Sequence, residues 1–371
     1  MKTLEILVVG AGIGGLSAAI ALCRKGHHVT LIERDPQWSV YGVGIIQQSN
    51  VVRAMEQLGV LDAFLDAACG FDAVEIFAPD GTKVARIPTP RLVEGKPANV
   101  GIGRQALQKV LADKAEGLGA KVRLGLTVET LDDDGTRVTA TFSDGTNGVY
   151  DAVIGADGVY SQMRSLILPD AERPEFTGQA VWRYNFPRAE GLDALQVYNG
   201  PTGVGLVPMS QDLMYMYVTT PEPGNPWYPT EGIAATMRGK LKGCAPVIRE
   251  LGERITDDAA VVYRPLEGML VTGAWSRGRI GLLGDAVHAT TPHLGQGAGM
   301  AIEDAIVLAE ELDRHDTVEA AFNAYRDRRF ERCAYIVRAS LAICHGQLGI
   351  APPVDNHKAT GEMFAVVSQP I

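Results

Sequence analysis

The sequence predicts an α/β fold in which a domain built on a parallel sheet is interrupted by a second, mainly antiparallel β domain. Leu4–Val9 is an apolar run, interrupted only by Glu5, that ends at glycines, which is typical of a buried parallel strand. Apolar residues then recur at helical period over Leu16–Lys25, and a second strand-like run covers His28–Glu33, so the three segments form a β-α-β unit. From about residue 171 to 270 the pattern changes to short alternating β runs broken by prolines, which indicates a separate sheet layer.

The elements between these segments follow from the same patterns. A hairpin is expected at Val74–Ile87, around an Asp-Gly turn, and we expect it to join the antiparallel layer. An amphipathic helix is expected at Arg104–Glu116. Three strand-like runs joined by Asp-Gly turns predict a small antiparallel meander, namely Val122–Thr127, Arg137–Phe142 and Gly148–Ile154.

The last third of the chain returns to the first domain. A strand is expected at Arg279–Gly284, and helices are expected at Gly299–Leu312 and Val318–Cys344. The residues from Pro352 onward have weak periodicity and are expected to form an extended tail. The expected boundaries are residues 1–70, 101–170 and 271–350 for the first domain, 71–100 and 171–270 for the inserted domain, and 351–371 for a C-terminal tail.

Composition and charge exclude several classes of protein. Of 371 residues 46% are hydrophobic and 21% charged, which is ordinary globular usage and excludes a disordered or low-complexity chain. The net charge of -10 and the lack of a Lys/Arg block argue against a nucleic-acid partner. Five scattered cysteines form no CxxC pair, which indicates a reduced, cytoplasmic protein. Glycines crowd the uncharged stretch Ile6–Cys23, so no membrane segment is expected, while a monomer and a homodimer both stay open.

A glycine-rich turn carries the first chemical signal. The residues Gly10-Ala11-Gly12-Ile13-Gly14-Gly15 end the first strand and open the first helix. Glycines there let the backbone approach a pyrophosphate, which sits on the unpaired amides and the positive dipole end of the helix. Glu33, at the end of the next strand, can accept hydrogen bonds from ribose hydroxyls. The pattern predicts a Rossmann-like dinucleotide site, and the alternative is a glycine turn that serves close packing alone.

Two further strands end in a glycine-flanked acid. One runs through Asp151–Gly158 and includes Asp157, and the other runs through Arg279–Ala286, includes Asp285, and continues to a glycine-rich helix start. Together with the first turn, these blocks resemble the FAD-dependent class A aromatic hydroxylases, a family that includes salicylate, 3-hydroxybenzoate, 6-hydroxynicotinate and urate hydroxylases. The resemblance covers about residues 1–350.

The resemblance implies that FAD is the cofactor and that all three blocks hold it. Asp285 matches an acid that holds the ribityl hydroxyls and the pyrophosphate region, and Asp157 matches a motif implicated in binding both FAD and NAD(P)H. Arg104 matches an arginine that contacts the FAD phosphate or ribityl chain. For both acids a second interpretation stays open, in which they cap the element that follows. The expected cofactor-binding set is Gly10, Gly12, Gly14, Gly15, Glu33, Arg34, Arg104, Asp157, Asp285, Gly295, Gly297 and Ala298.

The same resemblance implies a reaction. NADH or NADPH reduces the flavin, O2 adds to give the flavin C4a-hydroperoxide, and this species hydroxylates an electron-rich ring. A helix that starts near Gly297 directs free amides and its positive dipole end at the reduced, anionic flavin. The expected substrate is a small phenolic or N-heteroaromatic compound. A larger antibiotic, quinone or polyketide-like substrate stays as one alternative, and a FAD-binding protein without turnover as another.

His293 and Tyr215 are the candidate catalytic residues. An unperturbed imidazole titrates near physiological pH, so His293 is a candidate for deprotonating a phenol or hydroxypyridine, and the alternative is a histidine that only bonds its loop. Tyr215 matches a substrate-proximal tyrosine of the urate and hydroxynicotinate enzymes, and the alternative is a core tyrosine. Period two places Tyr217 on the same strand face, which makes it a candidate substrate contact.

Three further residues complete the expected substrate site. Arg183 is a candidate for bidentate binding of a substrate carboxylate, and a surface salt bridge is the alternative. Gln47 has two open interpretations, facing the ring system or bonding backbone, and Pro292, next to His293, is a candidate substrate contact. No metal site is expected, because Asp285 and the two histidines after it lie in a glycine-rich context that fits a pyrophosphate better.

Overall fold

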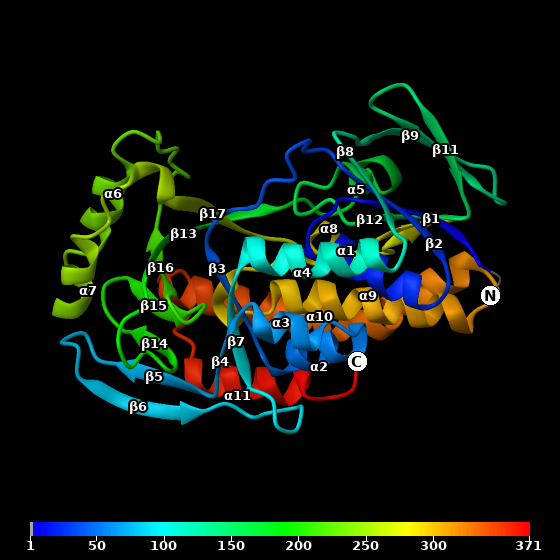
Figure 1. Ribbon diagram of the computed structural model, residues 1–371. Coiled ribbons are helices and arrows are strands. Elements are labelled where there is room, and N and C mark those ends of the chain that lie inside the picture. The colour runs from blue at the N-terminus through cyan, green and yellow to red at the C-terminus, as the bar shows by residue number, and fades with distance from the viewer. Residues whose placement is uncertain (1–2) are drawn as a thin grey trace.

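A six-stranded sheet with parallel strands at its centre organises the computed structural model, which describes residues 3–371 (Figure 1). In this sheet Leu7 lies opposite Thr30 on one side and opposite Val153 on the other, in parallel register. The strand order is β18 (Ser276–Arg277), β19 (Ile280–Leu282), β12 (Ala152–Gly155), β1 (Glu5–Val9), β2 (His28–Glu33) and β8 (Lys121–Leu124). The predicted α/β fold with its β-α-β start is confirmed.

Helices stack in layers beside this sheet (Figure 1). The first helix packs against α9 and α4, and α9 in turn packs against α10. Every residue of the first helix from Gly15 to Leu22 is buried, which explains why it is apolar on all sides. The helices of this part are α1 (Ile13–Arg24), α2 (Ser49–Leu58), α3 (Leu61–Asp66), α4 (Arg104–Gly117), α5 (Gln162–Ile167), α8 (Asp285–His288), α9 (Gly297–Arg314) and α10 (Val318–Gln347).

A seven-stranded sheet forms the second layer, and it includes the hairpin that the sequence predicts near residues 74–87. Its order is β17 (Val262–Gly268), β13 (Glu175–Pro187), β16 (Leu213–Pro221), β15 (Gly203–Pro208), β14 (Leu195–Tyr198), β5 (Ala73–Phe77) and β6 (Lys83–Pro88). All neighbours are antiparallel except β14 and β5. The predicted antiparallel layer is therefore confirmed.

Strand alternation gives this sheet two different faces. Trp182 and Met216 point to one face, where they share a hydrophobic core with two helices, α6 (Ile233–Lys240) and α7 (Pro246–Gly252). On β16, Tyr215 and Tyr217 alternate with Met216 and therefore point to the opposite face.

The predicted meander differs from the observed one at both ends. Its first run divides at a glycine: β8 joins the six-stranded sheet, and the next segment, β9 (Val128–Asp133), takes the place in the meander. Gly125 has φ +75°, a left-handed conformation that ends the first strand. The last run also divides, into β11 (Asn147–Tyr150) and β12. The meander order is thus β11, β10 (Val138–Phe142) and β9, and a further small sheet contains β3 (Gly44–Gln47), β7 (Asn99–Gly103) and β4 (Cys69–Phe71).

The expectation of an extended C-terminal tail is wrong. Residues Asn356–Val367 form a helix, α11, whose first amides donate to the N-cap carboxylate of Asp355. Ala359, Met363 and Val367 recur every four residues and are buried against the main core. Tertiary packing of this short apolar stripe outweighs the weak local pattern.

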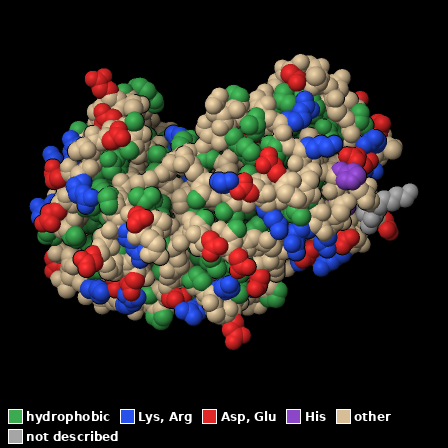
Figure 2. All heavy atoms as spheres, viewed as in Figure 1, with side chains coloured by type: hydrophobic (Ala, Val, Ile, Leu, Met, Phe, Trp, Pro, Cys, Tyr) green, Lys and Arg blue, Asp and Glu red, His purple; other side chains and the backbone are tan. Residues whose placement is uncertain are grey.

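The surface shown in Figure 2 carries acidic and basic side chains interspersed over the whole face. Exposed ion pairs of the chain include Lys109 with Asp113 at 2.7 Å. Within residues 3–371, no helix has the length and apolar character needed to cross a membrane.

Candidate active site

One cavity of about 1140 Å³ connects the six-stranded sheet with the seven-stranded sheet. Its walls come from the start of α1, the end of β2, β3, the starts of α4 and α9, the seven-stranded sheet and α11. The sequence-predicted residues that line it are Gly12, Gly14, Glu33, Arg104, Arg183, Tyr215, Tyr217, Asp285, Pro292, His293, Gly295, Gly297 and Ala298. Segments that are far apart in the sequence thus meet around a single space.

The glycines of the first turn divide into two groups. A Cβ added to Gly12 would meet no atom within 4 Å, and both Gly12 and Gly14 line the cavity. Gly10 has φ +103°, and a Cβ there would lie 2.5 Å from the Ala156 carbonyl oxygen. A Cβ on Gly15 would collide with the Gly10 carbonyl. Gly12 therefore keeps the cavity open, whereas Gly10 and Gly15 allow the turn and the close packing of α1 on β1. Gly14 also serves close packing, because a Cβ there would lie 2.9 Å from the Leu283 side chain.

Glu33 is fixed at the nucleotide end of the cavity by backbone amides. Its Oε2 accepts from the Ala11 amide at 2.9 Å, and its Oε1 accepts from the Asp35 amide at 3.0 Å. These bonds hold the carboxylate next to the glycine turn, and the oxygens retain lone pairs for ribose hydroxyls.

Two helices direct uncapped N-terminal amides at the cavity. Neither the N-cap of α1, Gly12, nor the N-cap of α9, Gln296, provides a side-chain cap. The first amides of an α-helix lack intrahelical partners and carry partial positive charge. A pyrophosphate at α1 and an anionic ring edge at α9 both satisfy this chemistry.

Arg104 and Asp285 place opposite charges on the cavity wall. Asp285 is exposed to the cavity but enclosed by protein, which raises the pKa of its carboxyl, against the opposing charges of His288 and Arg104. Burial lowers the pKa of Arg104, and Tyr215 and Asp285 oppose that shift. With the free amides and Glu33, these residues supply donors for phosphates and an acceptor for sugar hydroxyls, so the residues present fit FAD.

Besides Gly10 and Gly15, two more of the predicted cofactor residues lie outside the lining of this cavity. The Asp157 carboxylate accepts from Ser161 Oγ at 2.5 Å and from the Met163 amide at 3.0 Å, and it is absent from the cavity lining among the described residues. This geometry favours the interpretation that Asp157 caps α5. Arg34 is exposed and also lies outside the lining of the described cavity.

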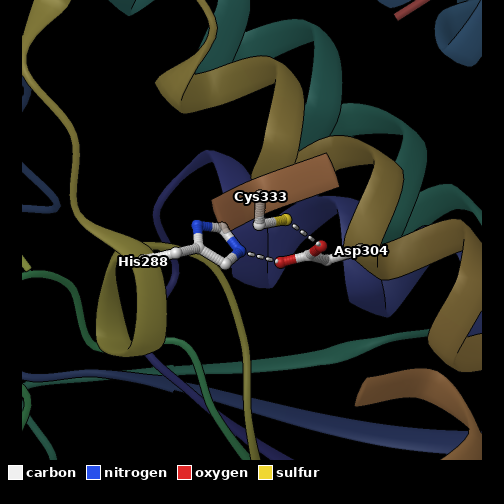
Figure 3. A group of neighbouring side chains, drawn as sticks. All are labelled: His288, Asp304 and Cys333. Carbon is white, nitrogen blue, oxygen red and sulfur yellow. Dashed lines mark hydrogen bonds and ion pairs between the residues drawn. The ribbon is translucent and has the colours of Figure 1, made fainter. Parts of the chain in front are cut away.

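A buried ionic cluster supports the cavity wall from behind (Figure 3). His288 Nε2 lies 2.6 Å from Asp304 Oδ2, and the Cys333 thiol also points toward Asp304. Burial by itself would lower the pKa of His288, but Cys333 and Asp304 raise it well above its usual value. Asp304 also accepts from the Gly284 amide at 3.1 Å and from Arg329 Nε at 2.8 Å. The cluster therefore anchors the loop that presents Asp285.

The neighbouring acid on α9 extends this cluster to the C-terminus. Glu303 accepts from Arg329 at 2.8 Å and from Arg332 at 3.2 Å. Arg332 also donates to the carbonyls of Gln369 at 2.9 Å and Pro370 at 2.6 Å, just after α11. The sequence analysis missed this network, although two adjacent acids within an apolar helix indicate buried partners.

Tyr215 and Tyr217 both line the cavity on the side of the seven-stranded sheet, as period two predicts. The Tyr215 ring lies so close to Gly44 of β3 that a Cβ there would collide with it. Burial raises the pKa of Tyr215 to about 12, against the charges of Arg183 and Arg104, so its hydroxyl is neutral at pH 7. Burial also raises the pKa of Tyr217.

Arg183 projects from β13 into the same end of the cavity. It forms no ion pair with any described residue, which contradicts the salt-bridge alternative. Burial and the like charge of Arg104 lower its pKa to about 10. An unpaired guanidinium in a partly dry cavity is suited to an anionic group of a ligand.

His293 has hydrogen-bond partners on both ring nitrogens. Nδ1 lies 2.9 Å from Thr291 Oγ1, and Nε2 lies 3.1 Å from Gln347 Oε1. Because that amide oxygen only accepts, His293 carries its proton on Nε2 and accepts from Thr291 with Nδ1. Burial lowers the pKa of His293 to about 4, against the hydrogen bond that His293 donates to Gln347. These contacts favour the interpretation that His293 holds its loop.

Gln47 fits neither of its two interpretations. Its side chain is buried, lies outside the cavity lining, and its amide forms no hydrogen bond to any residue within 3–371. The analysis also missed α11 as a cavity wall: Thr360 and Phe364 line the space, and so does Gln347 of α10.

Comparisons with known proteins identify the family. A family described as FAD binding domain matches residues 3–340. The putative FAD-dependent monooxygenase YetM of Bacillus subtilis is 32% identical over 98% of this chain and 99% of its own length. The 3-hydroxybenzoate 6-hydroxylase of Polaromonas naphthalenivorans is 34% identical over 91% of this chain and 86% of its own. The crystal structure of Klebsiella pneumoniae HpxO with FAD and uric acid matches with a TM-score of 0.83 and 26% identity, covering 99% of this chain and 93% of that one.

These matches span the glycine turn, the seven-stranded sheet and the helix that starts at Gly297, which are the parts that form the cavity. The chain therefore belongs to this FAD-binding family and is a FAD-dependent monooxygenase of the class A aromatic hydroxylase type.

Proposed function

We propose that this protein consumes NADH or NADPH and O2 to hydroxylate a phenolic or N-heteroaromatic ring. The observation that carries the proposal is the single cavity, in which the FAD-compatible donors and the unpaired Arg183 face the same space. Relatives named for acting on 3-hydroxybenzoate, or bound to uric acid, support a planar ring with polar substituents as substrate.

FAD bound here would supply the redox chemistry: it would pass two electrons from NAD(P)H to O2, so that one oxygen atom enters the ring and the other leaves as water. The free amides at the starts of α1 and α9, with Glu33, Arg104 and Asp285, hold and orient it. The amides and the positive dipole end of α9 favour negative charge at the ring edge that they face.

Arg183 and Tyr215 orient the substrate. The Arg183 cation binds a carboxylate or an ionised ring oxygen and favours the ionised form of that oxygen, which enriches the ring in electrons. Tyr215, neutral at pH 7, donates a hydrogen bond to a second polar atom of the substrate. The walls of aliphatic and aromatic side chains exclude water from the reacting centre. We infer that His293 holds its own loop in place through its hydrogen bonds to Thr291 and Gln347.

The test uses purified protein loaded with FAD. A screen of aromatic acids, hydroxypyridines and other N-heteroaromatic compounds measures the stimulation of NAD(P)H consumption, and mass spectrometry identifies the product. We expect at least one compound to accelerate NAD(P)H consumption and to gain one oxygen atom. Stimulated consumption that yields only hydrogen peroxide with every compound would contradict hydroxylation.

A further inference from the structure

We propose that the substrate carries a hydrocarbon substituent, which binds on an apolar floor formed by Val74, Ile76, Ile87, Leu195 and Val197. This inference rests on the proposed function, because it specifies the class of aromatic substrate. These five residues lie on three neighbouring strands, β5, β6 and β14, and all of them line the cavity. We refer to them as the apolar floor.

The register of the seven-stranded sheet places the floor in line with the polar end of the site. Arg183 pairs with Tyr217, Tyr217 with Gly205, Gly205 with Val197, and Val197 with Ile76. Directly paired residues project their side chains to the same face of a sheet. A continuous row of side chains therefore runs from the cationic end of the cavity to the aliphatic end.

Gly205 makes room for the Tyr217 ring in the middle of this row. A Cβ at Gly205 would collide with the Tyr217 ring, so the ring lies over the glycine backbone and leans toward β14. The aromatic surface of Tyr217 thus leads directly to Val197, the first residue of the apolar floor in this row.

The exposure of the floor is unusual for aliphatic strand residues. Each of the five is only partly buried, whereas the residues that alternate with them on β5, such as Glu75 and Phe77, are buried. Glu75 points to the opposite face, where it pairs with Lys83 at 2.6 Å and with Arg86 at 2.9 Å. The ion pairs of Glu75 therefore lie on the face that points away from the cavity, and the face that lines the cavity is apolar at these strands. Such contiguous apolar surface indicates a binding site for an apolar group.

The span of the row is too long for a single ring. Four strand spacings separate β13 from β5, which corresponds to roughly 19 Å. Phe364 and Met363 of α11 line the same cavity and add apolar surface to its wall. The polar end binds the anionic or hydroxylated head of the substrate, and the floor binds an alkyl chain or a fused apolar ring system attached to it.

Binding of 4-n-alkylbenzoates to the FAD-loaded protein tests this inference. Benzoate and its butyl and octyl derivatives are titrated by calorimetry, with flavin absorbance as a second signal. We expect the Kd to fall by up to about fourfold for each methylene that contacts the floor. Equal Kd values along the series, weaker binding of the longer chains, or no binding of any member would overturn the inference.

Variants locate the contact. Ile76→Asp and Val197→Asp should each remove most of the gain with chain length and leave the Kd of benzoate within about twofold. Val197→Thr nearly keeps the shape of the side chain and should remove part of the gain, which covers the case in which an aspartate variant does not fold. Val84→Asp is the matched control, because Val84 lies on β6, is 65% exposed and lies outside the cavity lining. A gain that persists in both floor variants would place the chain elsewhere and overturn the inference.

The failure of this inference and the failure of the proposed function give different results. An enzyme that hydroxylates a bare ring and shows no dependence of Kd on chain length retains the proposed function and refutes the floor. A protein that binds octylbenzoate on the floor and never transfers oxygen to any ring retains the floor and refutes the proposed function.

Discussion

Removing the charge of Arg183 should stabilise the protein and weaken its binding of anions. Arg183→Met keeps an apolar stem and removes the guanidinium. On folding, burial and the like charge of Arg104 disfavour the charged form of Arg183 and lower its pKa to about 10. Each pKa unit corresponds to about 1.4 kcal/mol, so the folded protein loses at most about 3 kcal/mol at any pH well below 10. The methionine variant should recover part of this free energy of unfolding.

The effect on binding has the opposite sign. Loss of one partner from a buried, hydrogen-bonded charge pair costs about 2–5 kcal/mol, which corresponds to an increase in Kd of about thirtyfold to several thousandfold. Urea denaturation measures the free energy of unfolding, and calorimetric titration with benzoate measures the Kd. Arg277→Met is the matched control, because Arg277 is exposed on β18 and its side chain forms no hydrogen bond with the described residues 3–371. A methionine variant at position 183 that is less stable than the parent and binds benzoate equally well would refute the reasoning.

Three other predictions concern the remaining parts of the site. Because the pKa of His293 is about 4, His293→Gln should leave the shape of the pH profile of hydroxylation unchanged from about pH 6 to 9. If the variant lost an inflection near pH 6.5, His293 would titrate in the reaction and the prediction would be wrong. Burial alone would raise the pKa of Asp304, but His288 and Arg329 lower it to about 2. Its contribution to stability is therefore present above about pH 4 and lost as the pH falls toward 2. Asp304→Asn should lower the free energy of unfolding by about 3–5 kcal/mol at neutral pH, which thermal denaturation measures. An unchanged Tm would contradict a charged pair. Gly15→Ala should destabilise the fold by collision with Gly10, whereas Gly12→Ala should fold normally and weaken FAD binding, as circular dichroism and flavin content will show; equal stability of the two variants would contradict this assignment.

Local patterns were sufficient to predict the elements whose burial follows from one segment alone. The apolar run before Gly10, the helix at Arg104–Gly117 and the alternation that places Tyr215 and Tyr217 on one face are of this kind. The meander boundary failed because the conformation of Gly125 decides which sheet each flanking segment joins. The C-terminal helix failed because its stability comes from a surface supplied by other parts of the chain.

The site residues show the same limit. Asp157 and Asp285 both follow a strand and a glycine-flanked turn, so their local sequences are similar. Asp157 meets the hydroxyl of Ser161 and an amide of α5, while Asp285 meets open space beside Arg104, and only the tertiary structure distinguishes the two. Arg183 is a comparable case, because whether an arginine on a strand finds an acid depends on the strands placed beside it.

Glu303 and Asp304 are consecutive on α9, but their hydrogen bonds support different parts of the cavity wall. Asp304 holds the amide of Gly284 on the nucleotide side, whereas Glu303 reaches the segment after α11 through Arg332. Arg329 pairs with both carboxylates, so neutralising either one leaves this buried arginine with a single counter-charge. Two adjacent residues therefore fix both the loop beside the sugar-phosphate chain of the cofactor and the end of α11, the helix that lies over the cavity.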